Sequence, residues 1–177
     1  NGALHTGAGM FAVSSGGALA VVRGAVIGAD DSRLRWIAPS GEARSAEPRS
    51  GVPAGGRLVA RLSPSGSRAL VDVLTPLRRE TWIADWVRNV WTPCERCGAS
   101  GGEWSPDGLR VVRGENDTLV AHTIEGTEPD QILLHERGRY LAAADWLAGD
   151  RIVYLSSPDQ TRYEIKVLEP GAPAGRG

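Results

Sequence analysis

The sequence predicts an all-β fold assembled from about four copies of one antiparallel, four-stranded unit. A tight-turn sequence recurs, because Ser-Pro-Asp-Gly at residues 105–108 stands 42 positions after Ser-Pro-Ser-Gly at residues 63–66. A short apolar run follows each turn, and 23 Gly and 11 Pro interrupt the 177 residues. Recurrence at a fixed period is typical of repeat architectures. Gly and Pro within every unit disfavour a helical repeat, since both residues are poor helix formers.

The repeated units are expected at residues 10–50, 57–98, 101–137 and 140–171 of a single domain that spans residues 1–177. Trp104 precedes the turn of the third unit, and Trp146 stands 42 positions later at the equivalent place in the fourth. This equivalence favours a packing role for the tryptophans over a stacking platform for ligands. About 42 residues per four-stranded sheet is the size of a β-propeller blade. We therefore predict a β-propeller or partial propeller of about four four-stranded antiparallel blades, with a β-sandwich of irregular hairpins as the alternative.

Alternating side-chain types predict the strands within a unit. In the first unit, the apolar Leu34 and Trp36 alternate with arginines, as expected for a strand whose two faces differ. In the third unit, strands are expected near residues 102–105, 110–114, 118–124 and 131–135. The Ser-Pro-Asp-Gly turn joins two of them as a hairpin loop, because Pro presets φ and Gly accepts a positive φ.

One window shows a different periodicity. Apolar residues recur there with the spacing of an amphipathic helix, at Trp82, Ile83, Trp86, Val87, Val90 and Trp91. The window nevertheless stands where the second unit needs its third and fourth strands. We therefore predict a strand, a turn near Arg88 and Asn89, and another strand, with a helix as the alternative.

The last unit supplies three strands rather than four. Its third strand alternates between two faces, with Tyr163, Ile165 and Val167 on one and Glu164 and Lys166 on the other. This strand leaves an unpaired backbone edge, and proteins cover or pair such edges. We therefore expect a homo-oligomer, most simply a dimer, in which a second chain covers the edge. The N-terminal residues 1–9 are the alternative cover, although their glycines make a poor strand.

Cys94 and Cys97 form the sharpest local motif, a Cys-x-x-Cys turn followed by glycine. Two thiolates placed in this way suit one zinc ion, but a structural zinc site needs four ligands. The sequence has no second Cys-x-x-Cys motif, and its histidines are widely separated, at His5, His122 and His135. Redox chemistry expects a helix N-terminus at the cysteines, which a β context does not supply. The open alternatives are free loop thiols, a local disulfide, or a metal half-site completed by another chain.

No other pattern points to catalysis or to a cofactor. Asp107, Asp150 and Asp159 stand in turn sequences, where aspartate bonds its own backbone. His122 alternates with apolar residues on an expected strand, which favours a packed structural role. The sequence has no Gly-x-Ser-x-Gly elbow and no phosphate-binding loop. We therefore predict no enzymatic activity and no cofactor.

The composition argues against two classes of partner. The formal net charge is −1, from 20 Lys and Arg against 21 Asp and Glu, which gives no bulk attraction to nucleic acid. No apolar run approaches the roughly 20 residues of a membrane-spanning helix. With 41% hydrophobic and 23% charged residues, the chain has the composition of a globular protein.

Two of these turn segments resemble a known family. Residues 104–112, Trp-Ser-Pro-Asp-Gly-Leu-Arg-Val-Val, are similar to the Trp-Ser-Pro-Asp-Gly (WSPDG) signature of TolB-like β-propellers, and residues 62–70 give a second, weaker match. Residues 11–14 and 35–41 resemble propeller segments attached to bacterial Ser/Thr kinases. The resemblance extends over nearly the whole chain, from residue 10 to residue 171.

The resemblance implies a propeller of about six blades, so four units indicate a fragment of a larger propeller or a half that assembles with another chain. It also implies the periplasmic or extracellular side of a bacterial envelope. By analogy, we expect a non-catalytic scaffold that binds protein or peptide through the loops at the blade ends. Two alternatives stay open: an accessory, substrate-gating propeller of a larger enzyme of the oligopeptidase type, and a structural fragment with no ligand of its own.

Overall fold

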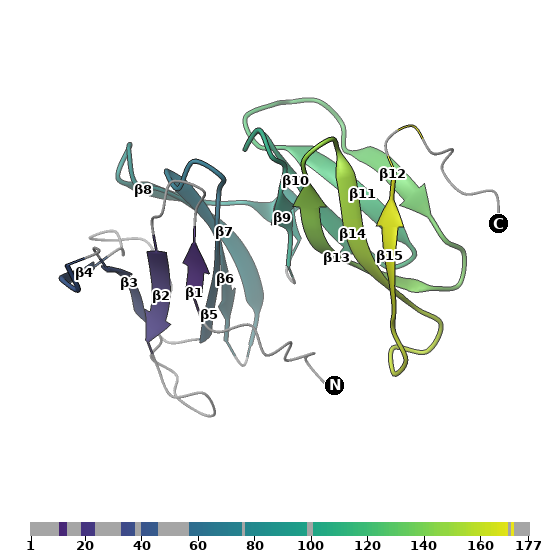
Figure 1. Ribbon diagram of the computed structural model, residues 1–177, viewed down its shortest axis with the longest axis horizontal. Coiled ribbons are helices and arrows are strands. Elements are labelled where there is room, and N and C mark those ends of the chain that lie inside the picture. Colours follow the sequence, from purple (N-terminus) through teal and green to yellow (C-terminus); the bar gives the residue numbers. More distant parts are fainter. Residues whose placement is uncertain are drawn as a thin grey trace. The chain divides into compact units, whose positions relative to one another are not determined.

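The computed structural model describes residues 11–13, 19–23, 33–37, 40–45, 57–75, 77–98, 101–169 and 171 (Figure 1). Within these ranges the chain forms four sheets, one 3₁₀ turn and no α-helix. The predicted all-β fold is therefore confirmed. No helix in the described part is long and apolar enough to cross a membrane. His5 and the alternative edge cover at residues 1–9 lie outside the described residues.

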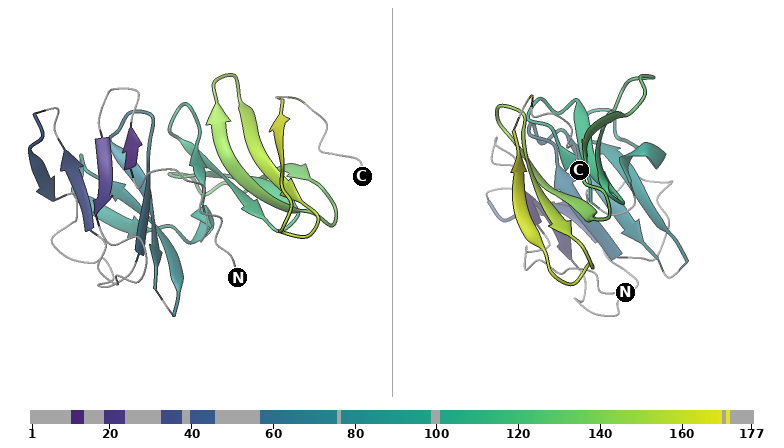
Figure 2. Two further views of the ribbon diagram at one scale, coloured as in Figure 1. Left: turned by 60° about the horizontal axis from the view of Figure 1, so that its bottom comes forward. Right: turned by 90° about the vertical axis from the view of Figure 1, so that its right-hand side faces the viewer.

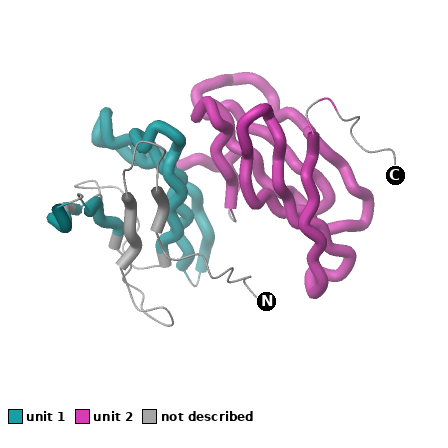
Figure 3. Tube along the Cα trace, in the orientation of Figure 1, with its two compact units in different colours: residues 1–92 teal, residues 93–177 magenta. Residues whose placement is uncertain are grey.

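The chain divides into two compact units, residues 1–92 and residues 93–177 (Figure 3). The first unit contains two four-stranded sheets in which consecutive strands pair with each other. One sheet consists of β1 (Phe11–Val13), β2 (Leu19–Arg23), β3 (Arg33–Ile37) and β4 (Ala43–Ser45). The other consists of β5 (Arg57–Leu62), β6 (Arg68–Leu74), β7 (Arg79–Asp85) and β8 (Val90–Pro93).

The second unit contains one four-stranded and one three-stranded sheet, again with the strands in sequence order. It begins with the 3₁₀ turn η1 (Glu95–Cys97). The four-stranded sheet consists of β9 (Glu103–Trp104), β10 (Arg110–Glu115), β11 (Thr118–Thr123) and β12 (Gln131–His135). The three-stranded sheet consists of β13 (Tyr140–Leu147), β14 (Arg151–Ser157) and β15 (Glu164–Leu168).

The turns after β5 and β9 share one hydrogen-bond pattern. The Gly66 N–H donates to the Ser63 carbonyl and the Gly108 N–H to the Ser105 carbonyl, each at 2.8 Å. Gly66 and Gly108 have φ of 72° and 70°, a left-handed conformation that glycine adopts without steric cost. In both turns the serine hydroxyl also accepts a backbone N–H, that of Arg68 at 3.1 Å in the first and that of Arg110 at 2.9 Å in the second. The hydroxyl and the glycine together explain why this turn sequence closes a hairpin.

The window of residues 82–91 is a strand, a turn and a strand, which confirms the prediction. β7 and β8 flank a turn in which Asn89 has φ of 53°, a conformation that asparagine tolerates. The helix-like spacing of the apolar residues has a packing cause. Trp86 in the turn meets the ring of Trp36 edge to face, with 4.6 Å between the ring centroids.

The core of the first unit lies between its two sheets. Leu34 of β3 belongs to one cluster of buried residues with Leu58 of β5 and with Val71 and Val73 of β6. Residues 69–73 of β6 are buried on both faces of the sheet, as the pattern of a central strand requires.

The core of the second unit likewise lies between its two sheets (Figure 2). Buried side chains from each sheet meet there: Val112, Leu119, Ala121 and Leu134 from one, and Leu141, Trp146, Ile152 and Tyr154 from the other. The register of β13 with β14 shifts between Ala143 and Asp145. This bulge changes which alternate residues face the core, and so Leu141 and Trp146 point to the same side.

The backbones of β10 and β13 approach each other at Gly114. A Cβ atom added there would lie 2.0 Å from the Leu141 carbonyl oxygen and 2.9 Å from Cα of Ala142. Glycine is the residue that permits such close backbone approach. Beside this contact, the Leu141 N–H donates to the Asn116 carbonyl at 2.8 Å. The turn after β10 is therefore tied directly to the start of β13.

We expect Gly114→Ala to lower the free energy of unfolding by about 3 kcal/mol, because the added methyl group must push β13 away from β10. Urea unfolding followed by tryptophan fluorescence measures the change. Gly126→Ala is the matched control, since a Cβ there would meet side-chain atoms of Thr123 and Glu128 at 3.1 Å and 3.2 Å, which can move. Equal stability of Gly114→Ala and wild type would show that the close approach does not hold the sheets together.

Candidate functional site

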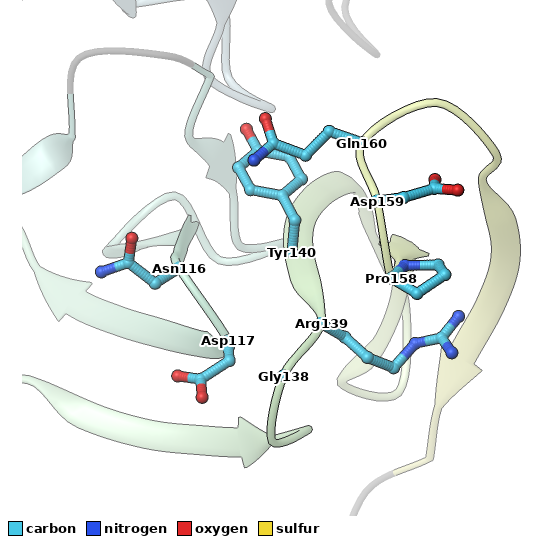
Figure 4. Close-up of a pocket in the computed structure, with 8 residues that line it drawn as sticks. All are labelled: Asn116, Asp117, Gly138, Arg139, Tyr140, Pro158, Asp159 and Gln160. Carbon is cyan, nitrogen blue, oxygen red and sulfur yellow. The ribbon is translucent and has the colours of Figure 1, made fainter.

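Three connections in the second unit line an open, shallow pocket with a volume of about 410 Å³. Because alternate strands of a meander run in the same direction, the connections that follow β10, β12 and β14 lie at the same end of their sheets. Side chains from all three line the pocket (Figure 4): Asn116, Asp117, Gly138, Arg139, Tyr140, Pro158, Asp159 and Gln160. Pockets formed by loops on a rigid scaffold are where binding residues concentrate.

Backbone hydrogen bonds fix two of these connections to each other. The Glu136 N–H donates to the Asp117 carbonyl at 2.9 Å, in addition to the bond from Leu141 to Asn116. Asn116 has φ of 54° and Gly138 has φ of 72°, the left-handed conformations that these residue types favour in tight turns. Backbone bonds therefore hold these two connections together.

The Asp159 side chain fixes the third connection. Its Oδ1 accepts the backbone N–H groups of Thr161 at 2.9 Å and Arg162 at 3.0 Å. These hydrogen bonds stabilise the ionised carboxylate and hold the pKa of Asp159 far below its ordinary value. The aspartate therefore organises its own loop, as its turn sequence predicted.

Arg139 links the pocket to a part-buried polar network. Its Nε donates to Ser156 Oγ at 2.5 Å, and its Nη2 donates to Glu164 Oε2 at 2.9 Å. The Ser156 hydroxyl in turn donates to Glu136 Oε2 at 2.6 Å. A guanidinium with two such partners has a fixed orientation at the rim of the pocket.

Glu136 is the centre of this network. Besides Ser156, its carboxylate accepts the Tyr154 hydroxyl at 2.7 Å and the Lys166 ammonium at 3.1 Å. Burial alone would raise the pKa of Glu136, but the hydrogen bonds from Ser156, Tyr154 and Lys166 outweigh burial and lower it. Burial and the neighbouring carboxylate raise the pKa of the Tyr154 phenol. Glu136 is therefore a carboxylate at neutral pH, and Tyr154 keeps its proton.

Asp117 gives the pocket a fixed negative charge in addition to that of Asp159. His135 Nε2 lies 3.0 Å from Asp117 Oδ2, and this hydrogen bond holds the pKa of Asp117 below its usual value. Three other lining side chains are not held by bonds of this kind. Among the described residues, the amides of Asn116 and Gln160 and the phenol of Tyr140 make no side-chain hydrogen bond. The pocket can therefore offer amide, phenol and carboxylate groups to a polar ligand.

Cys94 and Cys97 do not belong to this pocket. The two residues are joined in a disulfide and are 8% and 0% exposed. Of the three alternatives left by the sequence, the structure contains the local disulfide rather than free loop thiols. A half-site for a metal would need the reduced form, because disulfide sulfurs are not thiolate ligands.

The disulfide turn is connected to a second polar cluster around Asp130. Arg96, which lies between the two cysteines, donates to the Asp130 carboxylate and to the Glu128 carbonyl. Arg113 Nη2 and His122 Nδ1 lie 3.0 Å and 3.1 Å from the same carboxylate. Burial would raise the pKa of Asp130, but the hydrogen bonds from Arg113 and Arg96 outweigh burial and lower it. The cluster therefore holds the connection between β11 and β12.

His122 occupies the packed position that its strand pattern predicted. The residue is 5% exposed. Burial, together with the charge of Arg96, lowers the pKa of the imidazole. The neutral imidazole is thus the stable form at pH 7. In the described part of the chain, no group of three or more His, Cys, Asp or Glu side chains is arranged to hold a metal ion.

The equivalent tryptophans pack as the sequence predicted. Trp104 and Trp146 are 6% and 5% exposed. The Arg110 guanidinium lies over the Trp146 ring at 4.8 Å from its centroid, and the Trp146 indole N–H donates to Asp150 at 3.2 Å. The Asp107 carboxylate caps its own turn by accepting the Leu109 N–H at 2.9 Å.

Solved structures that are similar to this chain in fold include β-propellers of the TolB type. A chain from a structural and mechanistic study of two prolyl endopeptidases aligns over 88% of this chain, with a TM-score of 0.64 and 17% identity. TolB from Acinetobacter baumannii aligns over 92% of this chain, with a TM-score of 0.55 and 14% identity. A TolB-type protein from Agrobacterium tumefaciens aligns over 89% of this chain, with a TM-score of 0.66 and 15% identity. This chain spans 27%, 43% and 60% of the lengths of those three chains. No protein-family model and no curated protein sequence matches it.

The sheets are therefore blades of a β-propeller fold, similar to that of TolB. At 14% to 17% identity the likeness concerns the fold alone. The function has to be argued from the pocket, whose residues sequence reasoning missed except for Asp159. A turn signal at Asn116 and Asp117 was available, but nothing in the sequence indicates that three connections meet.

The Glu136 network should make the stability of the protein depend on pH. Its lowered pKa means that the folded state binds this proton more weakly than the unfolded chain, whose carboxyl keeps the ordinary value of 4.5. The network therefore stabilises the fold above pH 4.5, and this contribution is lost as the pH falls below 4.5 through the folded-state pKa.

Glu136→Gln should accordingly lower the free energy of unfolding by about 2 kcal/mol at neutral pH, and by much less in acid. Urea unfolding at neutral and acid pH tests this difference. Glu169→Gln, at an exposed carboxylate, is the control and should change stability little at either pH. The role assigned to Glu136 is wrong if its variant loses the same stability at both pH values.

The disulfide should be dispensable for folding, since the core comes from the strands. We expect Cys94→Ala together with Cys97→Ala to lower the free energy of unfolding by no more than about 2–4 kcal/mol, as for small-loop bridges. Circular dichroism of the double variant should keep its β-sheet signal, and a metal chelator should leave the wild type folded. Complete unfolding of the double variant would contradict the prediction and show that the fold needs the disulfide. Unfolding of the wild type by a chelator would contradict it in favour of a metal half-site.

Proposed function

We propose that this chain is a non-catalytic β-propeller scaffold that binds protein or peptide through the loops at one end of its blades, with the pocket of the second unit as the binding site. One observation carries the proposal: three connections from two sheets are fixed by their own backbone and turn bonds. The side chains of Asn116, Tyr140 and Gln160 line the pocket and make no side-chain hydrogen bond among the described residues, so they can bind a ligand. Rigid loops of this kind lose little conformational entropy when they bind a partner.

The chemistry of the lining favours an extended peptide segment as the ligand. Side-chain amides can both donate to and accept from peptide backbone groups. Tyr140 adds an aromatic face and a phenol, a combination that is enriched at binding surfaces. The residues that line the pocket include no nucleophile hydrogen-bonded to a base. We therefore favour a binding role over a catalytic one.

The alternative is an accessory, substrate-gating propeller of a larger enzyme of the oligopeptidase type. The likeness to a prolyl endopeptidase chain favours it, because inter-domain dynamics have a role in the catalysis and specificity of those endopeptidases. The full-length reading frame discriminates these functions. A downstream Gly-x-Ser-x-Gly elbow would support the enzyme, and an upstream Ser/Thr kinase would support a sensor. If the reading frame contains neither, the two remaining functions are the binding scaffold and a structural fragment that has no ligand.

We also infer that the chain forms a homo-oligomer, most simply a dimer, through the exposed edge of its last blade. Support comes from β15, whose outer side pairs with no strand within the described residues, and from the exposed side chains of Ile165 and Val167. Light scattering over a range of concentrations tests the inference. A particle of 18.8 kDa at every concentration would contradict it.

A random-peptide library displayed on phage provides the test of binding. Peptides selected on the wild-type chain are measured by calorimetry against Tyr140→Phe and Gln160→Ala. Loss of one hydrogen bond should weaken binding about tenfold in each variant. Leu77→Ala, at a side chain that is 95% exposed in the first unit, should bind as the wild type does. Failure to select any peptide, or equal affinity of all variants, would contradict the proposal.

A further inference from the structure

The turn after β5 repeats the turn after β9, with a serine in place of an aspartate. Ser-Pro-Ser-Gly at residues 63–66 corresponds to Ser-Pro-Asp-Gly at residues 105–108, so Ser65 occupies the position of Asp107. The first serine of each turn is buried, at 1% and 0% exposure. The glycines that end the two turns have the same left-handed φ, 72° and 70°. The two turns therefore share one backbone structure and differ in the side chain at the third position.

Asp107 shows what a negative charge meets at this position. Its Oδ1 accepts the Ser105 hydroxyl, and it also accepts the Leu109 N–H at 2.9 Å. These two hydrogen bonds stabilise the carboxylate and lower the pKa of Asp107. The Arg110 guanidinium lies 3.9 Å from Oδ2 of the same carboxylate. The turn therefore favours a negative charge at its third position.

Ser65 meets the same kinds of donor with a neutral side chain. The Ser67 N–H donates to Ser65 Oγ at 3.3 Å, from two residues along the chain as in the turn after β9. The Ser63 and Ser67 hydroxyls lie 3.2 Å and 2.8 Å from the same oxygen. An arginine begins the next strand in both places, and here it is Arg68. The donor arrangement that stabilises a carboxylate in one turn thus surrounds a hydroxyl in the other.

We propose that Ser65 is a phosphorylation site, at which phosphoserine supplies the negative charge that Asp107 supplies in the equivalent turn. The partner is a protein kinase, and the phosphoryl donor is a nucleoside triphosphate. Ser65 Oγ forms a bond to the γ-phosphorus, and the bond from that phosphorus to the oxygen bridging the β-phosphorus breaks. The nucleoside diphosphate leaves, and the hydroxyl proton passes to a base of the kinase. The product presents three acceptor oxygens to the donors of the turn.

Exposure distinguishes Ser65 from the other serines of this turn. Ser65 is exposed, Ser67 is half-buried and Ser63 is buried. Ser63 Oγ also accepts the Arg68 N–H at 3.1 Å, so the turn would have to open before Ser63 could react. Ser65 is therefore the hydroxyl that a kinase can reach in the folded protein.

The charge of the first unit also favours an anionic group. Residues 1–92 contain 11 Arg and no Lys against seven Asp and Glu, a formal net charge of +4. A phosphoserine carries about −1.5 to −2 charges at pH 7. Phosphorylation thus reduces the net charge of this unit, instead of adding to an excess of the same sign.

Mass spectrometry of the full-length protein from its native cells tests the modification directly. Trypsin cleaves after Arg61 and Arg68 and so releases residues 62–68 as one peptide with three serines. Fragment ions should place a phosphate on Ser65, in growing or in starved cells. Cells that express Ser65→Ala are the control, and their peptide should carry no phosphate. A peptide without phosphate under both conditions, or with phosphate only on another serine, would overturn the proposal.

A second experiment tests whether the turn holds the group as it holds Asp107. Phosphoserine is incorporated at position 65 during translation, and stability is measured by urea unfolding above pH 7. Hydrogen bonds to a charged acceptor are stronger than neutral ones, so the ratio of folded to unfolded chain should rise about fivefold. Asp107→Ser makes the reverse change and should lower the ratio. Phosphoserine at position 40 is the matched control, because Ser40 is exposed in the same unit and accepts only a long bond of 3.5 Å from the Glu42 N–H.

Phosphorus NMR distinguishes a held phosphate from one that is only attached. The second pKa of phosphoserine is ordinarily about 6, and the donors of the turn should lower it at position 65 relative to position 40. A lower pKa at position 65 together with greater stability supports the proposal. Equal titration of the two phosphates, or a chain that phosphoserine at position 65 destabilises, overturns it.

Discussion

The close approach of β10 to β13 is the constraint on which the second unit depends. Gly114 has no side chain, and the Leu141 carbonyl occupies the space that a Cβ would need. The Leu141 N–H then reaches the Asn116 carbonyl, and two sheets become one packed body with a shared core. The pocket follows from the same contact, because it brings the turn after β10 against the connection before β13. A wider separation would open both the core and the pocket.

Two part-buried carboxylates fix the conformations of connections between the strands. Glu136 collects a hydroxyl, a phenol and an ammonium group from three other residues. Asp130 collects two guanidinium groups and an imidazole. Removing a carboxylate from water is costly, and several partners are needed to offset that cost. Each network therefore specifies one conformation of a connection, which apolar packing alone would not do.

The sequence could predict the features that local chemistry determines. The Ser-Pro-Asp-Gly turn, the buried position of His122 and the strands around Asn89 follow from turn geometry and alternation. The sequence leaves the state of Cys94 and Cys97 open, since a Cys-x-x-Cys spacing is compatible with free thiols, with the disulfide that the structure contains, and with a pair of metal ligands. The pocket could not be predicted, because Arg139 and Gln160 meet only after two sheets have packed. The same holds for Gly114, whose role depends on a strand far along the sequence.

Backbone and turn bonds fix the connections that line the pocket, whereas its uncommitted groups are the side chains of Asn116, Tyr140 and Gln160. Folding and recognition thus draw on different atoms of the same loops. Tyr140 and Gln160 could be exchanged during evolution, or in a designed library, while the framework that displays them persists. Asn116 is less free, because its φ of 54° restricts the position largely to asparagine, aspartate or glycine. Specificity could therefore diverge quickly on this scaffold at two positions and slowly at the third.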